Sequence, residues 1–149
     1  MTEKEMWKLC CEKNKIDENV SYEAWAFCGG GPLADELAEL VLEGRKTATA
    51  STLIAYEVEN DPIPKTGCYN VILFDNGEAA CVIRDTKVSV IPFDEVSKEH
   101  AYKEGENGRT LREWREVHKK TFTPDYHAAG KEFEEKGLCV LEEFERVYP

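Results

Sequence analysis

The chain has 149 residues, of which 42% are hydrophobic, and this size and composition are typical of one globular domain rather than of a disordered protein. Thirty acidic residues against nineteen basic ones give a formal charge of −11 at pH 7, which repels phosphate backbones. We therefore expect no tight binding to long nucleic acid, whereas a small nucleoside or nucleotide, or one exposed RNA base, remains compatible with the charge.

The first third of the chain predicts two helices and then a strand. A Thr-x-x-Glu capping box opens a helix over residues 2–14, and residues 17–22 are expected to form a connection. A glycine-rich break at 29–32 is interpreted as a flexible loop. An amphipathic helix follows over 32–44, because apolar residues recur there at helical spacing. The hydrophobic period then changes to two, which predicts a strand over 46–55.

The remainder of the chain predicts a small antiparallel sheet with two further helices. Strands over 68–74 and 79–91 flank an Asp-Asn-Gly hairpin signal. A short helix is expected over 92–103, and a second capping box starts a helix at 110 that we expect to break at a Thr-Pro-Asp sequence. A closing strand is expected over 138–147. This order predicts an α+β fold, as one domain of residues 1–149 with an N-terminal helical extension at about 1–20.

Other sequence features bear on location and cofactors. No apolar run approaches the about 20 residues of a membrane span, and the first residues lack the pattern of a signal peptide, so we expect a cytoplasmic protein. The six cysteines include no C-x-x-C pair, and the three histidines have no zinc-like spacing. We therefore expect reduced thiols, no metal and no cofactor.

The junction between the second helix and the first strand carries the most informative residues. Lys46 stands at this junction, where its side chain can point into a cleft, and Thr49 and Ser51 share one face of the strand. A cation beside aligned hydroxyls suits a site that handles a carbonyl or phosphate oxygen. Lys46 could stabilise an oxyanion or act as a base, and Thr49 is the candidate nucleophile or proton relay. The alternative is a solvated lysine beside threonines that simply favour a strand.

Two acidic residues could complete the site. Glu104 and Glu106 flank a glycine in the loop that precedes the second capping box. A carboxylate there that reaches Lys46 would tune the lysine and orient a substrate amine or a water molecule. The alternative is an acidic loop that is only solvated.

Four further residues are candidate ligand contacts. Arg84 interrupts an apolar strand, so it either pairs with an acid or binds a ligand anion. Arg109 lies in the acidic loop and is a second candidate for ligand binding. Trp25 and Phe27 could stack on a base, and the alternative is that both belong to the core.

Several of these segments together resemble one bacterial branch of the ASCH family, whose small PUA-like barrels are linked to RNA and modified nucleosides. The resemblance covers residues 20–122 and includes a Gly-x-Lys-x-x-Thr signature at 44–49. The other matching segments are Trp25-x-Phe27, Ala34–Leu37, Val82–Thr86, Pro92–Phe93, Glu104–Glu106 and Leu111-x-x-Trp114-x-x-x-His118. The resemblance implies a small PUA-like antiparallel β-barrel flanked by helices, with a cleft beside the lysine.

The resemblance also implies a function. Small relatives that remove the acetyl group from N4-acetylcytidine use a Lys, Thr and Glu set, which corresponds here to Lys46, Thr49 and Glu104, with Glu106 as a near competitor. This correspondence implies a metal-independent hydrolase of an amide or ester on a modified nucleoside. The alternatives are a non-catalytic RNA- or nucleotide-binding module and a ribonuclease. Those relatives carry an arginine where this chain has Ser51, and they lack the N-terminal helix.

Overall fold

The computed structural model describes all 149 residues and has the expected α+β architecture, with one five-stranded sheet and five α-helices. The strands lie in the order β1-β3-β4-β5-β2, and β4 and β5 form the long central pair. Their bounds are β1 (Tyr22–Trp25), β2 (Ala48–Thr52), β3 (Tyr69–Leu73), β4 (Ala79–Pro92) and β5 (Leu138–Tyr148). The edge strands β1 and β2 are not hydrogen-bonded to each other, so the sheet is barrel-like without being closed by a ladder.

The sheet is mixed rather than wholly antiparallel. The pairs β3–β4, β4–β5 and β2–β5 are antiparallel as expected, whereas β1 runs parallel to β3. The sequence predicts a connection at 17–22 and no strand after it. A strand of four residues whose burial does not alternate carries no period-two signal, which explains why β1 escaped that analysis.

The helices largely follow the sequence prediction. The Thr2 side chain accepts a hydrogen bond from the Glu5 backbone and completes the expected capping box of α1. The expected helix over 92–103 is divided into a 3-10 turn at Phe93–Glu95 and a short α-helix. The α-helices are α1 (Glu3–Asn14), α2 (Pro32–Leu42), α3 (Leu53–Glu59), α4 (Lys98–Glu104) and α5 (Leu111–Ala128). None of them combines the length and the apolar character needed to cross a membrane.

Two predicted boundaries are wrong, and each has a local cause. The strand expected over 46–55 ends at Thr52, because the Thr52 hydroxyl accepts a hydrogen bond from the Ala55 backbone and so starts α3. The last long helix continues through Pro124 instead of breaking there. Pro124 is exposed, while Phe122 and Tyr126 on either side of it are buried, so packing holds the helix together across the proline.

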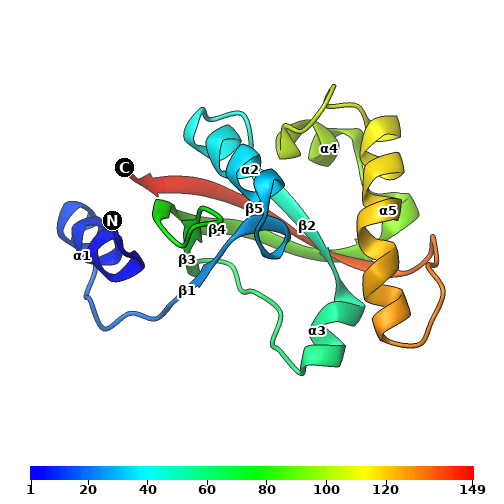
Figure 1. Cartoon of the computed structure of the whole chain (residues 1–149), viewed down its shortest axis with the longest axis horizontal. Helices are drawn as coiled ribbons and strands as arrows, with labels where there is room; N and C mark the ends of the chain where they lie inside the picture. The colour runs from blue at the N-terminus through cyan, green and yellow to red at the C-terminus, as the bar shows by residue number, and fades with distance from the viewer.

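Three buried clusters tie the helices to the sheet. Helix α1 packs on β3 and β4 at one end of the molecule, α2 packs on the middle of the sheet, and α5 covers the other end together with α4, as Figure 1 shows. Each cluster is anchored by a large side chain: Trp7 in α1, Phe27 beside α2 and Trp114 in α5. The space between the Phe27 cluster and the Trp114 cluster contains the polar residues described below.

Pro124 gives a direct test of the helix that covers the site. Replacing Pro124 by alanine restores a backbone donor within a helix that already exists, so Pro124→Ala should raise the free energy of unfolding by about 1 to 3 kcal/mol. Lys120→Ala, an exposed position in the same helix, is the matched control and should change stability by less than about 0.5 kcal/mol. Denaturant titration measures both values, and a destabilised Pro124→Ala protein would contradict a continuous helix.

Candidate functional site

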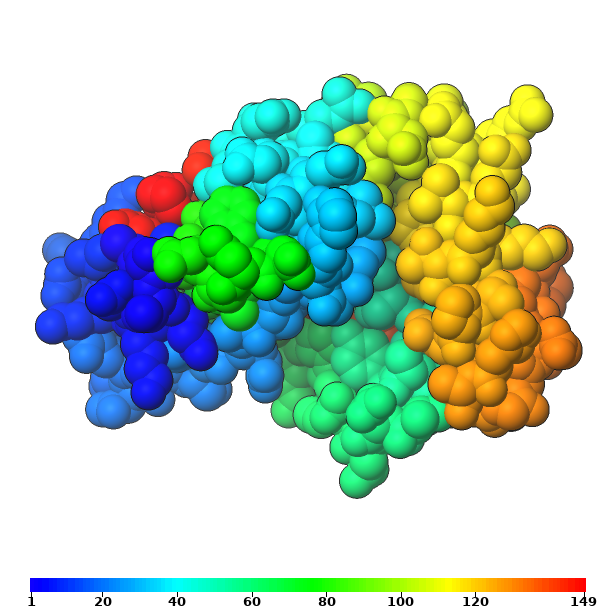
Figure 2. Space-filling view, viewed as in Figure 1, coloured from blue at the N-terminus to red at the C-terminus, as the bar shows by residue number.

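A cavity of about 870 Å³ lies between the Phe27 cluster and the Trp114 cluster and is lined by residues of both. Figure 2 shows it as a hollow bordered by α2, α3 and α5. Seven of the residues that the sequence analysis selected line this cavity: Trp25, Phe27, Lys46, Thr49, Ser51, Glu104 and Glu106. Residues that are distant in the sequence are therefore gathered around one space, which is large enough for a small organic ligand.

Lys46 is buried in the wall of the cavity, and its side chain is only 1% exposed. Its ammonium donates to the Ala48 carbonyl at 2.8 Å and to Glu106 Oε2 at 2.9 Å, and it lies 3.5 Å from Glu104 Oε1. The ammonium also lies 5.3 Å from the centre of the Phe27 ring. These contacts exclude the alternative of a solvated lysine. The third ammonium hydrogen has only a long hydrogen bond, 3.5 Å to the Glu104 backbone carbonyl, so it is the one that can turn towards a ligand oxygen.

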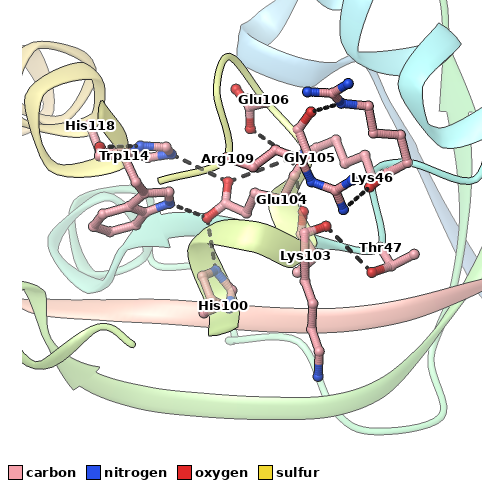
Figure 3. Close-up of polar contacts among 12 residues, drawn as sticks. Lys46, Thr47, His100, Lys103, Glu104, Gly105, Glu106, Arg109, Trp114 and His118 are labelled. Atoms are coloured by element: carbon pink, nitrogen blue, oxygen red, sulfur yellow. Dashed lines mark hydrogen bonds and ion pairs between the residues drawn. The ribbon is translucent and has the colours of Figure 1, made fainter. Parts of the chain in front are cut away.

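Glu104 is the electrostatic centre of the site, and its side chain is 1% exposed. Figure 3 shows donors converging on its carboxylate from α4, α5 and the Lys46 segment. Oε2 accepts from Trp114 Nε1 at 2.5 Å and contacts His100 Nε2 at 2.8 Å, and Oε1 lies 3.3 Å from His118 Nε2. The carboxylate is therefore held by groups on every side.

The surroundings of Glu104 decide its charge. Burial alone would disfavour the carboxylate, but the nearby Lys46 ammonium and the hydrogen bonds from His100 and His118 hold the pKa of Glu104 well below its ordinary value. His118 also directs Nδ1 at the Trp114 carbonyl, 2.8 Å away. Both nitrogens of His118 thus face oxygen atoms, which fixes the ring between Glu104 and the Trp114 carbonyl.

The two acidic residues that the sequence analysis could not separate have different surroundings. Glu104 has both oxygens engaged and is almost wholly buried, whereas Glu106 is 17% exposed and has one oxygen bonded to Lys46. Glu106 is therefore the carboxylate with a free oxygen at the cavity. Glu104 is a fixed counter-charge that holds Lys46 in place.

The hydroxyls of β2 reach the cavity as expected. Thr49 is half-buried, and its side chain has no hydrogen bond within the protein, so its hydroxyl is free to engage a ligand. The Ser51 hydroxyl lies 3.3 Å from that of Tyr56 in α3. Thr49 pairs across the sheet with Glu142 of β5, a buried cavity residue that the sequence analysis missed. The sequence signal that could have identified Glu142 is its charge directly after the apolar residues 138–141, because a charge next to a buried strand segment can face a cavity.

The aromatic candidates lie beside each other in the cavity wall. The Trp25 and Phe27 rings meet edge to face, with centroids 5.0 Å apart. Trp25 Nε1 donates to Asn70 Oδ1 at 2.8 Å, which fixes the indole, while Phe27 is buried under Lys46. Trp25 is therefore the one with a surface available to a ligand.

The two arginine candidates lie outside the cavity. Arg84 is partly exposed and pairs with Glu145 across β4 and β5 at 3.4 Å. Arg109 stacks on Tyr102, with its guanidinium carbon 3.6 Å from the ring centre, and donates to the Tyr102 carbonyl at 2.9 Å. Neither residue shares a wall with Lys46.

The loop that carries Glu106 is fixed to the segment that carries Lys46. Arg45 donates to the carbonyls of Gly105 at 2.6 Å and Asn107 at 2.8 Å. Gly105 has a φ of +72°, and a Cβ at that position would lie 2.4 Å from the Arg45 carbonyl oxygen. Only glycine permits this close approach, so the spacing of Lys46 and Glu106 depends on backbone contacts as well as on charge.

The same acidic cluster has the spacing of a metal site. Ligand atoms of Glu104, Glu106 and His118 lie within 4.8 Å of one another. The Lys46 ammonium, however, already lies 2.9 Å from one of these carboxylates and 3.5 Å from the other. Lys46 therefore takes the place that a metal cation would need.

Comparison with known proteins identifies the family of the chain. The family model of the ASCH domain matches residues 23–148, and the chain belongs to the ASCH domain family, whose PUA-like fold is often linked to RNA binding. No curated protein matches the sequence.

Solved structures extend the match over nearly the whole chain. The structure is similar to an ASCH domain from Lactobacillus crispatus JV V101, with a TM-score of 0.87 and 32% identity over 97% of this chain and 96% of that one. It is also similar to protein EF3133 from Enterococcus faecalis V583, with a TM-score of 0.85 and 33% identity over 96% and 86% of the two chains. The hypothetical protein PH0355 shares only the fold, with a TM-score of 0.53 and 20% identity over 84% of this chain and 97% of that one.

Because Glu104 is the buried counter-charge of Lys46, removing its charge should strongly lower the stability of the protein. Glu104→Gln keeps the shape of the side chain but leaves Lys46 without its buried counter-charge, so the free energy of unfolding should fall by about 3 to 5 kcal/mol. Glu106→Gln is the matched control and should cost less, because Glu106 is partly reached by water. Equal stabilities of the two variants in denaturant titration would contradict the central position of Glu104.

The depressed pKa of Glu104 adds a pH dependence. Its contribution to stability is present above the ordinary glutamate pKa of 4.5 and is lost as the pH falls through the lower pKa of the folded state. The stability difference between the wild type and Glu104→Gln should therefore shrink as the pH is lowered from about 6 to about 3. A difference that stays constant over this range would show that the carboxylate charge is not what stabilises the fold.

Proposed function

We propose that this protein is a metal-independent hydrolase that cleaves an amide or ester on a small modified nucleoside, with N4-acetylcytidine as the test substrate. One observation carries the proposal: a buried lysine, neutralised by two carboxylates, lies in the wall of a cavity that Thr49 also lines. A fixed charge that is shielded from water interacts strongly with charge that develops during acyl transfer.

The excess of negative charge in the cavity wall supports a nucleoside rather than RNA as the ligand. Its lining includes two lysines against six carboxyl side chains, and Lys46 is already paired with Glu104 and Glu106. Phosphate recognition relies on uncompensated lysine and arginine, so this wall is unfavourable for a nucleic-acid backbone. The overall charge of −11 acts in the same direction. A ribonuclease or a long-RNA binder is therefore the weaker interpretation.

The proposed reaction assigns a role to each cavity group. The Thr49 hydroxyl adds to the acyl carbon while the Lys46 ammonium stabilises the oxyanion. The hydroxyl proton passes to Glu106 and then to the leaving nitrogen as the C–N bond breaks. Water adds to the resulting acyl ester, which returns a proton to Thr49 and releases the carboxylic acid. One water is consumed for each amide, and Glu104 acts as a positioning residue for Lys46.

The test is incubation of the purified protein with N4-acetylcytidine, with cytidine and acetate followed by chromatography. Thr49→Ala and Lys46→Met should each lower turnover by at least about a hundredfold, because they remove the nucleophile and the oxyanion donor. Thr47→Ala is the matched control, since Thr47 is exposed and lies outside the cavity lining, and it should retain activity.

The outcomes separate the candidate functions. Turnover that is lost in both variants and retained in Thr47→Ala supports the hydrolase. Binding of N4-acetylcytidine without turnover, weakened by Lys46→Met, would replace the hydrolase by a non-catalytic binding module. Turnover that survives Lys46→Met and Thr49→Ala would show that the catalytic assignment is wrong.

A further inference from the structure

A second pair of buried acids lies beside the same cavity, away from Lys46. Asp85 on β4 is fully buried, and Glu142 on β5 is 5% exposed. No lysine, arginine or histidine forms an ion pair with either of them. Asp85 Oδ2 accepts a weak hydrogen bond from Cys68 Sγ at 3.3 Å, while Asp85 Oδ1 is buried and has no donor. Two carboxyl groups therefore share a buried region that holds no cation.

The pair can be satisfied by one proton. Two adjacent buried carboxylates without a cation are strongly unfavourable, so one of them takes up a proton. Burial, followed by the hydrogen bond and the charge of Asp85, raises the pKa of Glu142 to about 9. A proton on Glu142 also gives Asp85 the donor that it otherwise lacks. At neutral pH the pair then carries a single negative charge.

Glu142 is the member of the pair that reaches the ligand space. Glu142 lines the cavity, whereas Asp85 lies behind it. On the neighbouring strand, Glu142 faces Thr49, and side chains that are paired in this way lie on the same side of the sheet. With its proton given to Asp85, Glu142 presents a carbonyl-type acceptor to the cavity, immediately beside the proposed nucleophile.

We propose that Glu142, held by Asp85, recognises an exocyclic N–H of an amino-substituted nucleobase such as cytosine. The inference rests on the proposed function for the assignment of nucleosides to this cavity. The negative pair favours a donor and repels an acceptor, so an amino group is accepted where a keto oxygen is rejected. In an N4-acylated cytosine the same nitrogen still carries one hydrogen, which lies next to the carbonyl that Thr49 would attack.

The binding test compares cytidine with uridine, which carries a keto oxygen in place of the amino group, by isothermal titration calorimetry. The wild type should bind cytidine at least about tenfold more tightly than uridine. Glu142→Gln should keep this preference, because its amide can donate to Asp85 and present the same carbonyl oxygen. Glu142→Leu should lose it. A preference that survives in Glu142→Leu, or no preference in the wild type, would overturn the proposal.

A second readout tests the shared proton independently of any ligand. The raised pKa of Glu142 means that its contribution to stability is full below the ordinary value of 4.5 and is lost as the pH rises towards about 9. Glu142→Gln should therefore gain stability relative to the wild type as the pH rises from about 5 to about 8. An unchanged difference across this range would overturn the shared proton.

Other titratable groups near the pair do not imitate this behaviour. Tyr56 from α3 and Cys68 before β3 face the pair, and burial raises the pKa of both, that of Cys68 to about 11. Both therefore stay protonated below pH 9.

N4-acetylcytidine turnover, measured in the same Glu142 variants, separates the two proposals. A base preference that depends on Glu142, found without any turnover, would support Glu142 as the recognition group and contradict the hydrolase.

Discussion

The burial of one lysine ammonium constrains the rest of this structure. A charge withdrawn from water must be matched by fixed partners, and Lys46 is matched by Glu104, Glu106 and a backbone carbonyl. Glu104 in turn requires donors of its own, which come from α4 and α5. The helices over this end of the sheet are therefore placed by hydrophobic packing and by the need to satisfy one carboxylate.

The cavity combines two solutions to the problem of buried charge. At one wall a cation is neutralised by carboxylates, and at the other burial and the neighbouring Asp85 raise the pKa of Glu142, beside which no cation lies. Thr49 lies between these walls, three residues after Lys46 and across the sheet from Glu142. A space of this kind offers fixed dipoles and little net positive charge, which is suited to a small uncharged ligand with polar edges.

Local sequence signals predicted most of the framework and part of the site. Capping boxes, the change of period at Lys46 and the family resemblance predicted four of the five helices, four of the five strands, the β3–β4 hairpin and the main cavity residues. What could not be predicted depends on tertiary packing: the short parallel strand β1, the helix α3 started by Thr52, and the helix that continues through Pro124.

The site residues show the same limit. A charge within a strand can pair across the sheet or face a cavity, and the sequence contains no information on which occurs. Arg84 is a predicted ligand contact but pairs with Glu145, whereas Glu142, which begins a run of acids, lines the cavity and is not among the predicted site residues. Glu104 and Glu106 also became distinguishable only through the partners that surround each of them.

The central claim is that the cavity between Lys46 and Glu142 is the ligand site. It is tested most directly by titrating isotope-labelled protein with cytidine and following amide and indole resonances by nuclear magnetic resonance. The account predicts dose-dependent shifts confined to residues around the cavity, including the Trp25 indole and the backbone of Thr49 and Glu142. Shifts confined to another face, such as the outer surface of α1, would contradict it.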